Sequence, residues 1–584
     1  MIENAVSSGM RSVYTRLSER RLFWSMVAAL ALAALAFLLF VAPRTGDMFP
    51  RSTRGLPEAQ EPAFITLQDG DTYDISASYV VKEIGNRRIR MIAYNGSVPG
   101  PFVSAPQGAT VTMRFTNDLD IETTVHSHGL RLGYLSDGTP GLSQEPVKPG
   151  ETFVYTLTFP DAGVYWYHPH VREDYAQELG MYGNYLIEPV KYALSPVNES
   201  VPLIIDDILF DGDDIEPFYR DRTNFAIMGR FGDVMLVNGV TDYTRSFAAG
   251  DVVRFDITNV ANARPFELSV PGAKMKLVGS DLSPYERETF VENVLIAPSE
   301  RYIVDVYFPK AGEYTLTHTS HDRTLGVMRY DMATFTVTPG ARESYKADFE
   351  TLRAYPWVSE EAAVFSDILF KKPARSLRIT LDPGSVDFGD WMQELPCHRM
   401  PDGEWMGACT DAKKEAWLAG LSEEERALGG EKIHWEDHTF AMNRVTTNQD
   451  ITWQLLDETS GKANEKIDDW KFETGETIKL RVFNDPVSAH PMQHPFHVHG
   501  QRIMTLSVNG TEVENKVWKD TILIPVGDTY DIIVEFSNPG LWMAHCHIAE
   551  HLSAGMMFTF AVGKEHFDAY DAFVAKGTHE GHGH

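Results

Sequence analysis

Cysteine is scarce in this sequence, with only three among 584 residues. Cys397 and Cys409 flank a loop that contains Pro and Gly, and a disulfide between them is expected if this part of the chain lies outside the cytoplasm. So few cysteines exclude a scaffold held together by many disulfides. Cys546 is then left unpaired, and its thiolate is available to a metal ion.

Basic residues are also few, with 52 Lys and Arg against 82 Asp and Glu, which gives a net charge of −30. This charge repels phosphates, so the sequence predicts no nucleic-acid partner. Steering of cations and plain solubility are both compatible with it. An apolar fraction of 43% is typical of a globular chain, and the length exceeds what one hydrophobic core supports, so several domains are expected.

Long apolar runs are absent except for Leu22–Ala42, which only Ser25 interrupts. About 21 residues at about 1.5 Å each span a hydrocarbon core, so this run predicts a transmembrane helix. Arginines at 11, 16, 20 and 21 favour a cytoplasmic N-terminus and place the rest of the chain outside the cytoplasm, on the periplasmic face of a Gram-negative cell. Arg20-Arg21 also resembles a twin-arginine export signal. No small-x-small cleavage site is evident, so we expect an uncleaved anchor; the alternative is a removed signal peptide.

The rest of the chain repeats one pattern three times. A turn glycine, an alternating strand and a closing Asn recur at 108–117, 250–259 and 475–484. A second element recurs downstream, and its aligned position is His168, then Thr317, then His545. Short alternating strands between turns predict antiparallel sandwiches or Greek-key barrels. Residues from about 382 to 436 interrupt the third repeat, and a helix across Asp411–Leu428 is expected there as a lid on the surface.

Histidine pairs stand out against this background. Twenty histidines predict roughly 0.7 His-x-His pairs by chance, whereas the sequence holds five: His126/His128, His168/His170, His497/His499, His545/His547 and His582/His584. On a strand, residues two apart point to the same side, so each pair presents two imidazoles together. The last pair lies in a tail, where loose metal binding or plain solvation is expected.

One stretch, Trp542–Met556, combines a thiolate, imidazoles and a thioether. Soft sulfur together with imidazole favours copper. If the stretch begins as a strand, Cys546 points to one face while His545 and His547 point to the other, so two metal centres can share three consecutive residues. Cys546, His551 and Met556 supply much of a blue-copper site, which lacks only a second His.

The four histidine motifs resemble the copper motifs of the multicopper oxidases, the laccase-like family. They are His126-Ser127-His128-Gly129, Trp166-Tyr167-His168-Pro169-His170, His494-Pro495-Phe496-His497-Val498-His499-Gly500 and His545-Cys546-His547-Ile548 followed by His551. The resemblance implies an all-β fold of three cupredoxin-like Greek-key β-sandwich domains, here preceded by the N-terminal transmembrane helix. It also implies four copper ions, one type 1, one type 2 and two type 3.

The apolar run, the three repeats and the resemblance together predict a domain division. It comprises a cytoplasmic segment (1–21), an anchor or export signal (22–42), a linker (43–60), cupredoxin-like domains at 61–195, 196–345 and 346–565, and a His-containing tail (566–584). The middle domain carries no copper ligand, because Thr317 stands where the outer domains have His168 and His545.

Carried over position by position, the resemblance gives each ligand a role. His494, Cys546 and His551 would hold type 1 copper, with Met556 as the axial ligand, and His126 and His497 would hold type 2 copper. The type 3 pair would be held by His128, His168, His170, His499, His545 and His547. Electrons taken singly by the type 1 site would pass from Cys546 to the three-copper cluster, where O₂ becomes water.

Two carboxylates are candidates for proton transfer. Asp137 resembles the acid that the family places beside the cluster, although an Asp-Gly turn without chemistry is the alternative. Bacterial laccases commonly carry a second acid directly after the last type 1 histidine, where this chain has Leu552. Glu550 lies nearby and is the candidate substitute.

The reducing substrate is the open question. The leading hypothesis is a membrane-anchored laccase-like oxidase of phenols or related aromatic donors, because an axial Met lowers the type 1 potential and favours easily oxidised donors. The alternative is a metallo-oxidase of Cu(I), Fe(II) or Mn(II), to which scattered Met and acidic clusters lend some support, although no dense Met-rich insert is present. A copper nitrite reductase is disfavoured by the three repeats, and a non-enzymatic copper-binding or division-scaffold relative by the complete ligand set.

Overall fold

The computed structural model describes residues 48–322, 326–340, 344–384, 386, 398–399, 405–406, 409–420 and 431–576. Of the described residues, 51–218 and those from 222 onward belong to one compact unit, and 48–50 with Tyr219–Asp221 belong to another. Within the described ranges, no helix is both long and apolar enough to span a bilayer. The expected membrane segment 22–42, the twin-arginine signal, Cys397 and the last His pair all lie outside the described residues. Cys409 is disulfide-bonded, and Cys546 is free and buried.

The first pair of sheets uses residues 64 to 188. Its five-stranded sheet has the order β1 (Phe64–Thr66), β4 (Phe102–Pro106), β9 (Gly183–Glu188), β8 (Gly163–His168), β6 (His126–His128). Its four-stranded sheet has the order β3 (Arg87–Tyr94), β2 (Thr72–Ile84), β5 (Thr110–Asn117), β7 (Thr152–Thr158). The sheets meet through aromatic side chains: the rings of Tyr94 and Tyr167 lie 5.2 Å apart, and the Tyr73 and Tyr185 hydroxyls 3.3 Å apart.

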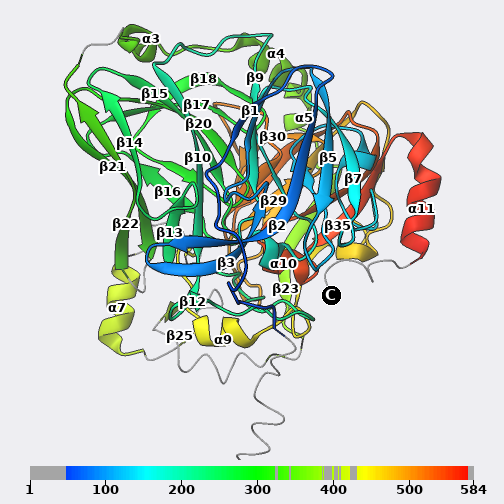
Figure 1. Ribbon diagram of the computed structural model, residues 1–584. Helices are drawn as coiled ribbons and strands as arrows, with labels where there is room; N and C mark the ends of the chain where they lie inside the picture. Colours follow the sequence, from blue (N-terminus) through cyan, green and yellow to red (C-terminus); the bar gives the residue numbers. More distant parts are fainter. Residues whose placement is uncertain are drawn as a thin grey trace, which may run out of the picture. The chain divides into compact units, whose positions relative to one another are not determined.

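The second pair follows the same plan and has one continuous core. Its six-stranded sheet has the order β13 (Val234–Val237), β10 (Glu199–Ile208), β15 (Val252–Asn259), β20 (Arg301–Tyr307), β17 (Lys274–Ser280), β18 (Ser283–Val291). Its five-stranded sheet has the order β14 (Tyr243–Ala248), β22 (Gly326–Thr338), β21 (Gly312–Asp322), β16 (Phe266–Ser269), β19 (Val294–Ile296). Buried side chains such as Phe255 and Phe335, stacked at 5.1 Å, come from both sheets. Figure 1 labels the two strands that carry them, β15 and β22.

The third pair is built from residues 375 to 562. Its six-stranded sheet has the order β26 (Thr452–Asp457), β23 (Arg375–Asp382), β28 (Glu476–Asn484), β33 (Thr529–Phe536), β30 (Arg502–Val508), β31 (Thr511–Glu512). Its five-stranded sheet has the order β27 (Lys471–Phe472), β35 (Met557–Val562), β34 (Gly540–Cys546), β29 (His494–Val498), β32 (Thr521–Ile524). Its core includes Cys546 and Met556. Two short ribbons complete the strands, β11 (Phe210–Asp211) with β12 (Asp214–Ile215) and β24 (His398–Arg399) with β25 (Trp405–Met406).

The helices are short. The α-helices are α2 (Glu173–Ala176), α3 (Lys346–Glu350), α4 (Pro356–Val364), α5 (Ser366–Leu369), α7 (Asp411–Gly420), α9 (Phe440–Val445), α10 (Ala549–Ser553) and α11 (Phe567–Ala575), with 3-10 turns η2 (Tyr134–Ser136), η3 (Asn464–Lys466) and η4 (Lys564–His566). Helix α7 agrees with the first part of the expected helix, and residues 421–430 lie outside the described ranges.

The repeated Asn has one structural role in all three sheet pairs. Each Asn is buried at the end of an equivalent strand, and its amide donates hydrogen bonds to two loop carbonyls. Asn117 donates to Ile121 and Val147 (2.8 Å each), Asn259 to Arg264 (2.9 Å) and Ile296 (3.0 Å), and Asn484 to Met492 (2.7 Å) and Ile524 (3.0 Å). One side chain therefore satisfies two buried carbonyls that the sheet leaves without donors.

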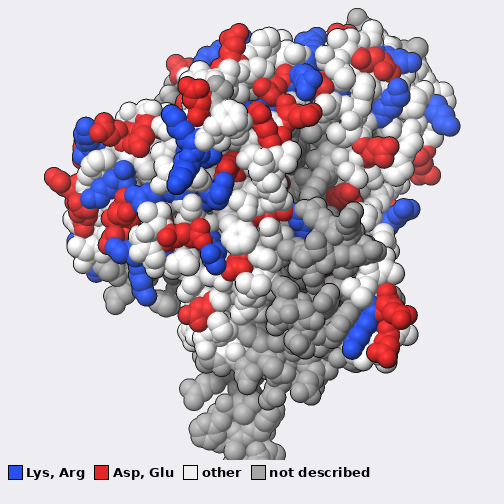
Figure 2. Space-filling model, turned by 180° about the vertical axis from the view of Figure 1, so that it is seen from behind, with Lys and Arg blue, Asp and Glu red and all other residues white. Residues whose placement is uncertain are grey.

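Charged side chains are mixed on the surface. Figure 2 shows Lys and Arg interspersed with Asp and Glu on the face that it draws.

Candidate copper centre

Two strand pairs position the histidines. In the first sheet pair, β6 and β8 are antiparallel with His126 opposite His168, and in the third, β29 and β34 are antiparallel with His497 opposite His545. Alternation along each strand puts residues two apart on the same side. Ser127, between His126 and His128, contacts Tyr185 in its own sheet (3.3 Å). All eight histidines of the four expected His-x-His motifs are buried.

The histidines gather into groups of three, each drawn from more than one strand or from the residues directly after a strand. The groups include His128, His168 and His547; His170, His499 and His545; and His126, His128 and His497. Each of the first two groups draws ligands from both the first and the third sheet pair. Neither sheet pair alone supplies a complete triad.

Hydrogen bonds fix which ring nitrogen of each histidine is free to bind a metal. A backbone carbonyl can only accept, so a ring nitrogen beside one carries the proton. Such bonds join Nδ1 of His126 to Asp137 O (2.6 Å), of His168 to Pro169 O (2.7 Å), of His497 to Asp520 O (3.0 Å) and of His545 to Cys546 O (2.8 Å). In each of these histidines Nε2 therefore carries the lone pair.

The nitrogens left over form the interior of the site. Nε2 of His126, His168, His170 and His497 is buried without a hydrogen-bond partner, as is Nδ1 of His128. Nε2 of His499 lies 2.9 Å from Nε2 of His545. Since Nδ1 of both rings donates elsewhere, the two lone pairs face each other, which is the arrangement of two ligands around one cation. The donor set therefore fits metal binding.

Burial keeps these imidazoles neutral. It lowers the pKa of His170 to about 4, against the opposing charge of Asp137, and that of His545 to about 3, with a further lowering by His170. The pKa of His128, His168 and His547 falls well below the ordinary value for the same reason. Neutral imidazole is the form that binds metals.

A separate group surrounds Cys546. Its Sγ lies 3.5 Å from His494 Nδ1 and 3.8 Å from His551 Nδ1, and the two Nδ1 atoms are 3.2 Å apart. His551 Nε2 donates to Ile227 O (3.2 Å), which leaves Nδ1 facing the thiol. Burial raises the pKa of the Cys546 thiol, so a cation would be needed to hold it as thiolate. Met556 is buried in the same core, and its carbonyl accepts the Cys546 N–H (3.1 Å).

Asp137 lies against two histidines. Its Oδ2 accepts from His499 Nδ1 at 2.9 Å and from the Thr139 hydroxyl at 2.6 Å, and its Oδ1 is 3.4 Å from His126 Nδ1. Gly138 allows this approach, because a Cβ there would lie 2.1 Å from Val125 O, and its φ of +85° suits glycine.

Glu550 is placed differently. Its Oε1 accepts from Asn262 Nδ2 (3.1 Å), and burial raises its pKa to about 7 against the opposing charge of Arg230. The hydrogen bond found for its carboxylate among the described residues thus goes to the second sheet pair. The structure does not bring Glu550 into hydrogen-bond contact with the triads.

Two acids of the site, Glu173 and Asp520, are not predicted from the sequence. Glu173 Oε1 lies 3.0 Å from His170 Nδ1, and burial raises the pKa of Glu173 to about 7. Asp520 Oδ1 lies 2.9 Å from His128 Nε2, and Arg301 Nη1 donates to the same oxygen at 2.7 Å. Position three after His170 in a short helix was a usable signal for Glu173. Nothing local to Asp520 points to His128, which is distant in the chain.

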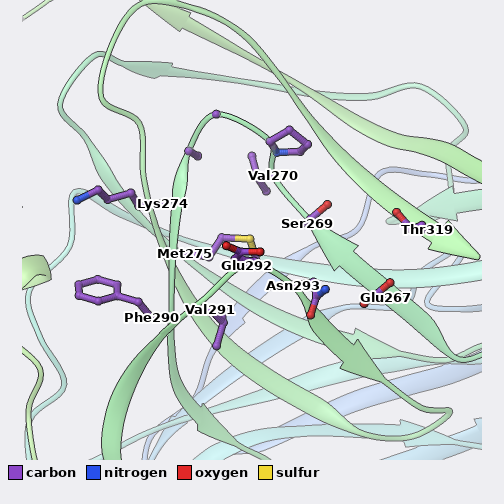
Figure 3. Close-up of a pocket in the computed structure, with 13 residues that line it drawn as sticks. Glu267, Ser269, Val270, Lys274, Met275, Phe290, Val291, Glu292, Asn293 and Thr319 are labelled. Carbon is purple, nitrogen blue, oxygen red and sulfur yellow. The ribbon is translucent and has the colours of Figure 1, made fainter. Parts of the chain in front are cut away.

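A surface pocket lies elsewhere. A cavity of about 570 Å³ is formed by β16, β17, β18 and their turns, and Figure 3 shows Glu267, Glu292 and Lys274 among its lining residues. Its lining contains none of the histidines of the triads, so it is not the copper centre.

Comparisons with known proteins agree with this geometry. Family models described as multicopper oxidase match residues 77–191, 190–342 and 435–566. Together these matches cover more than half of the chain, and the chain belongs to the multicopper oxidase family. It is a copper oxidoreductase that uses O₂, and its cofactor is four copper ions, one type 1, one type 2 and two type 3.

Individual relatives are distant but match over most of their length. A copper resistance protein A homolog of Pseudomonas syringae pv. tomato is 26% identical, covering 83% of this chain and 91% of the relative. Laccase-15 of Oryza sativa subsp. japonica is 24% identical over 92% and 96%. The structure of a Campylobacter jejuni multicopper oxidase, titled a metallo-oxidase, aligns with a TM-score of 0.61 and 22% identity over 88% of this chain and 99% of that chain. The all-β, cupredoxin-like fold predicted from the sequence is thereby confirmed.

Proposed function

We propose that each copper ion has the ligands that the family pattern assigns. Type 1 copper is bound by His494, Cys546 and His551, with Met556 axial, and type 2 copper by His126 and His497. One type 3 ion is bound by His128, His168 and His547, and the other by His170, His499 and His545. Support comes from the convergence of the lone-pair nitrogens.

The observation that supports the proposed oxidase activity is the direct covalent connection between the type 1 group and the two triads. Cys546 belongs to the type 1 group, and its neighbours His545 and His547 belong to the two triads. Bound copper supplies one-electron transfer and the binding of O₂. The chain holds the two sites one residue apart, so that four single electrons and four protons convert one O₂ to two waters.

Asp137 is the proposed acid for proton transfer at the cluster. Its carboxylate accepts the Nδ1 proton of His499, its backbone carbonyl accepts that of His126, and the side chain is buried beside both rings. Glu550 remains the sequence-based candidate for a second acid. The contact of Glu173 with His170 makes it a positioning residue that keeps Nε2 of that ring directed into the triad.

Phenolic or other aromatic donors are the first candidate substrates, as the sequence predicts, and relatives that are named laccases match nearly the whole chain. The second candidate is a metal ion, Cu(I), Fe(II) or Mn(II). It is favoured by His434, which is hydrogen-bonded to Gln493 directly before His494, and by relatives named copper resistance protein A.

The proposed location is outside the cytoplasm, on the periplasmic face if the cell is Gram-negative, with residues 22–42 as a membrane anchor and the twin-arginine route for export. Support comes from the apolar run and the arginines before it. The domain limits 61–195, 196–345 and 346–565 are likewise proposed, and each encloses one of the three sheet pairs.

The test follows O₂ consumption by the copper-loaded full chain with a phenol, Cu(I), Fe(II) or Mn(II) as sole donor. A Cys546→Ser variant is the control for uptake that bypasses the type 1 site. We expect uptake with at least one donor class and none in the control. Equal uptake by both proteins would contradict the proposed path, and the donor with the largest kcat/KM identifies the substrate class.

A further inference from the structure

Three histidines lie outside the copper centre but beside its type 1 end. His434 and His438 come from the segment before α9, and His490 comes from the loop before β29. All three are partly exposed, whereas His494 is fully buried. His490 precedes His494 by four residues, in the loop that leads into β29.

Direct hydrogen bonds attach this segment to the type 1 strand. The His434 N–H donates to Gln493 Oε1 (2.7 Å), and Gln493 Nε2 donates back to His434 O (2.9 Å). Gln493 immediately precedes His494 in the chain. From the other side, Trp435 is buried, and its carbonyl accepts from Arg264 Nη1 (2.8 Å). The segment is therefore fixed in place next to the type 1 ligand.

The ring of His434 lies near both of the other rings, at separations slightly longer than those in the copper triads. The centroid of His434 lies 5.9 Å from that of His490 and 6.1 Å from that of His438. Within the triad of His128, His168 and His547, the corresponding separations run from 4.9 to 5.7 Å.

A carboxylate stands behind His438. Asp322 Oδ2, at the end of β21, lies 2.8 Å from His438 Nε2, while Nδ1 of the same ring is buried without a hydrogen-bond partner among the described residues. Metal-binding histidines almost always donate the other ring N–H to an acceptor, and a carboxylate is one of the usual ones. An ordinary ion pair accounts for the contact between His438 and Asp322. It does not account for the presence of His434 and His490 in the same cluster.

We propose that His434, His438 and His490 bind a copper ion as substrate, so that its electron enters at the adjacent His494. The proposal rests on the proposed oxidase function and specifies its donor. Imidazole is a good ligand for copper, and the net negative charge of the protein draws cations to it. Each Cu(I) leaves as Cu(II) after losing one electron, and four such electrons with four protons reduce one O₂ to two waters.

The sharpest test compares His490→Met with His490→Leu in the copper-loaded full chain. Met and Leu have similar volume, so they differ mainly in the thioether, which is a ligand for Cu(I). We expect the ratio of kcat/KM for Cu(I) to that for a phenol to fall at least about tenfold in the Leu variant, the scale on which metal sites respond to lost support. The Met variant should stay near the parent.

A binding measurement separates the site from turnover. Ag(I), a soft cation that the enzyme cannot oxidise, is titrated into the loaded parent and a His434→Ala/His490→Ala variant. His566→Ala, whose ring contacts Tyr134, is the matched control. The double variant should bind one Ag(I) fewer per chain than the parent and the control, which share the same His-containing tail.

Equal Ag(I) binding by the parent and the double variant would overturn the proposal, as would equal Cu(I) oxidation by the Met and Leu variants. If no donor supports O₂ uptake while Ag(I) binding still falls, the proposed oxidase function fails and the metal site stands. Visible absorption of the type 1 copper reports whether each variant is folded.

Discussion

The first and third sheet pairs have the same strand framework as the second, but only they carry histidine ligands at the equivalent cross-strand positions. In the first and third pairs, the equivalent cross-strand positions are His126 opposite His168 and His497 opposite His545. In the second pair the corresponding register joins Ser269 to Thr317. The strands, their order and the buried Asn are retained there, so loss of ligands has not required loss of the fold.

The middle pair nevertheless supports the copper centre from behind. Arg301 on β20 donates to Asp520, which in turn lies against His128. Ile227 O accepts from His551, and Asn262 donates to Glu550. The outer sheet pairs thus supply the copper ligands, while the middle pair supplies groups that hold those ligands or their neighbours in place. The two contributions can be tested separately by substitution.

The largest effect is expected from replacing Cys546, the type 1 ligand whose two neighbours in the chain belong to the histidine triads. Cys546→Ser should abolish the type 1 absorption and reduce O₂ uptake by more than the 10–100-fold that loss of an orienting group costs. Copper analysis of the purified variant should show about one ion lost per chain. Retained activity with any donor would contradict the assignment of Cys546 as the only link.

Removing the repeated Asn distinguishes a structural from a metal-supporting role. Asn259→Ala and Asn484→Ala each leave two buried carbonyls without a donor, at about 1–3 kcal/mol for each. Both should lower the denaturation midpoint, but only Asn484→Ala should also weaken type 1 copper, because Asn484 holds the Met492 carbonyl two residues before His494. Copper loss in Asn259→Ala would show that damage to the second sheet pair also disturbs the type 1 site in the third.

The two buried glutamates can be compared in the same assay. Glu173→Leu removes the acceptor for His170 Nδ1 and should lower copper retention against a chelator about 10–100-fold, while Glu173→Gln, which keeps an acceptor oxygen, should lose less. Glu550→Gln serves as the counterpart, because its carboxylate is hydrogen-bonded to Asn262. A larger loss in Glu550→Gln than in Glu173→Leu would restore Glu550 as the more important acid.

The smallest effect is expected from restoring histidines to the middle pair. Ser269→His/Thr317→His recreates the cross-strand pair of the outer sheets, yet it supplies no third ligand from a facing strand. Copper content should remain four ions per chain by metal analysis. A fifth tightly bound ion would mean that two strands suffice to build a centre.

Much of the fold was predictable because it is locally encoded. The recurring Gly-strand-Asn pattern at 108–117, 250–259 and 475–484 corresponds to β5, β15 and β28. Alternation along β34 explains why His545 faces the triads while Cys546 faces His494, and His547, directly after the strand, continues the pattern. The expected ligands of the four motifs all lie in the grouped histidines, and Met556 lies in the core beside Cys546.

The supporting residues were less predictable. The sequence makes Glu550 a candidate acid because it is next to His551, but the short helix α10 directs its carboxylate toward Asn262. Glu173 belongs to another short helix in the first sheet pair, and its contact with His170 depends on the turn after Pro169. Asp520 is nearly four hundred residues from His128 in the sequence, so no local pattern connects them.

The sequence by itself determined the class of chemistry, because the residue types and their spacing of two along strands fix which ligands appear together. Only the tertiary structure decided how those ligands divide into metal sites, since each triad takes imidazoles from two sheet pairs. It also decided which nitrogen of each ring is free, because the acceptor that holds the other nitrogen often comes from a distant loop. Tertiary structure also places His434, which is 59 residues from Gln493 in the sequence but hydrogen-bonded to it, directly before the type 1 ligand His494.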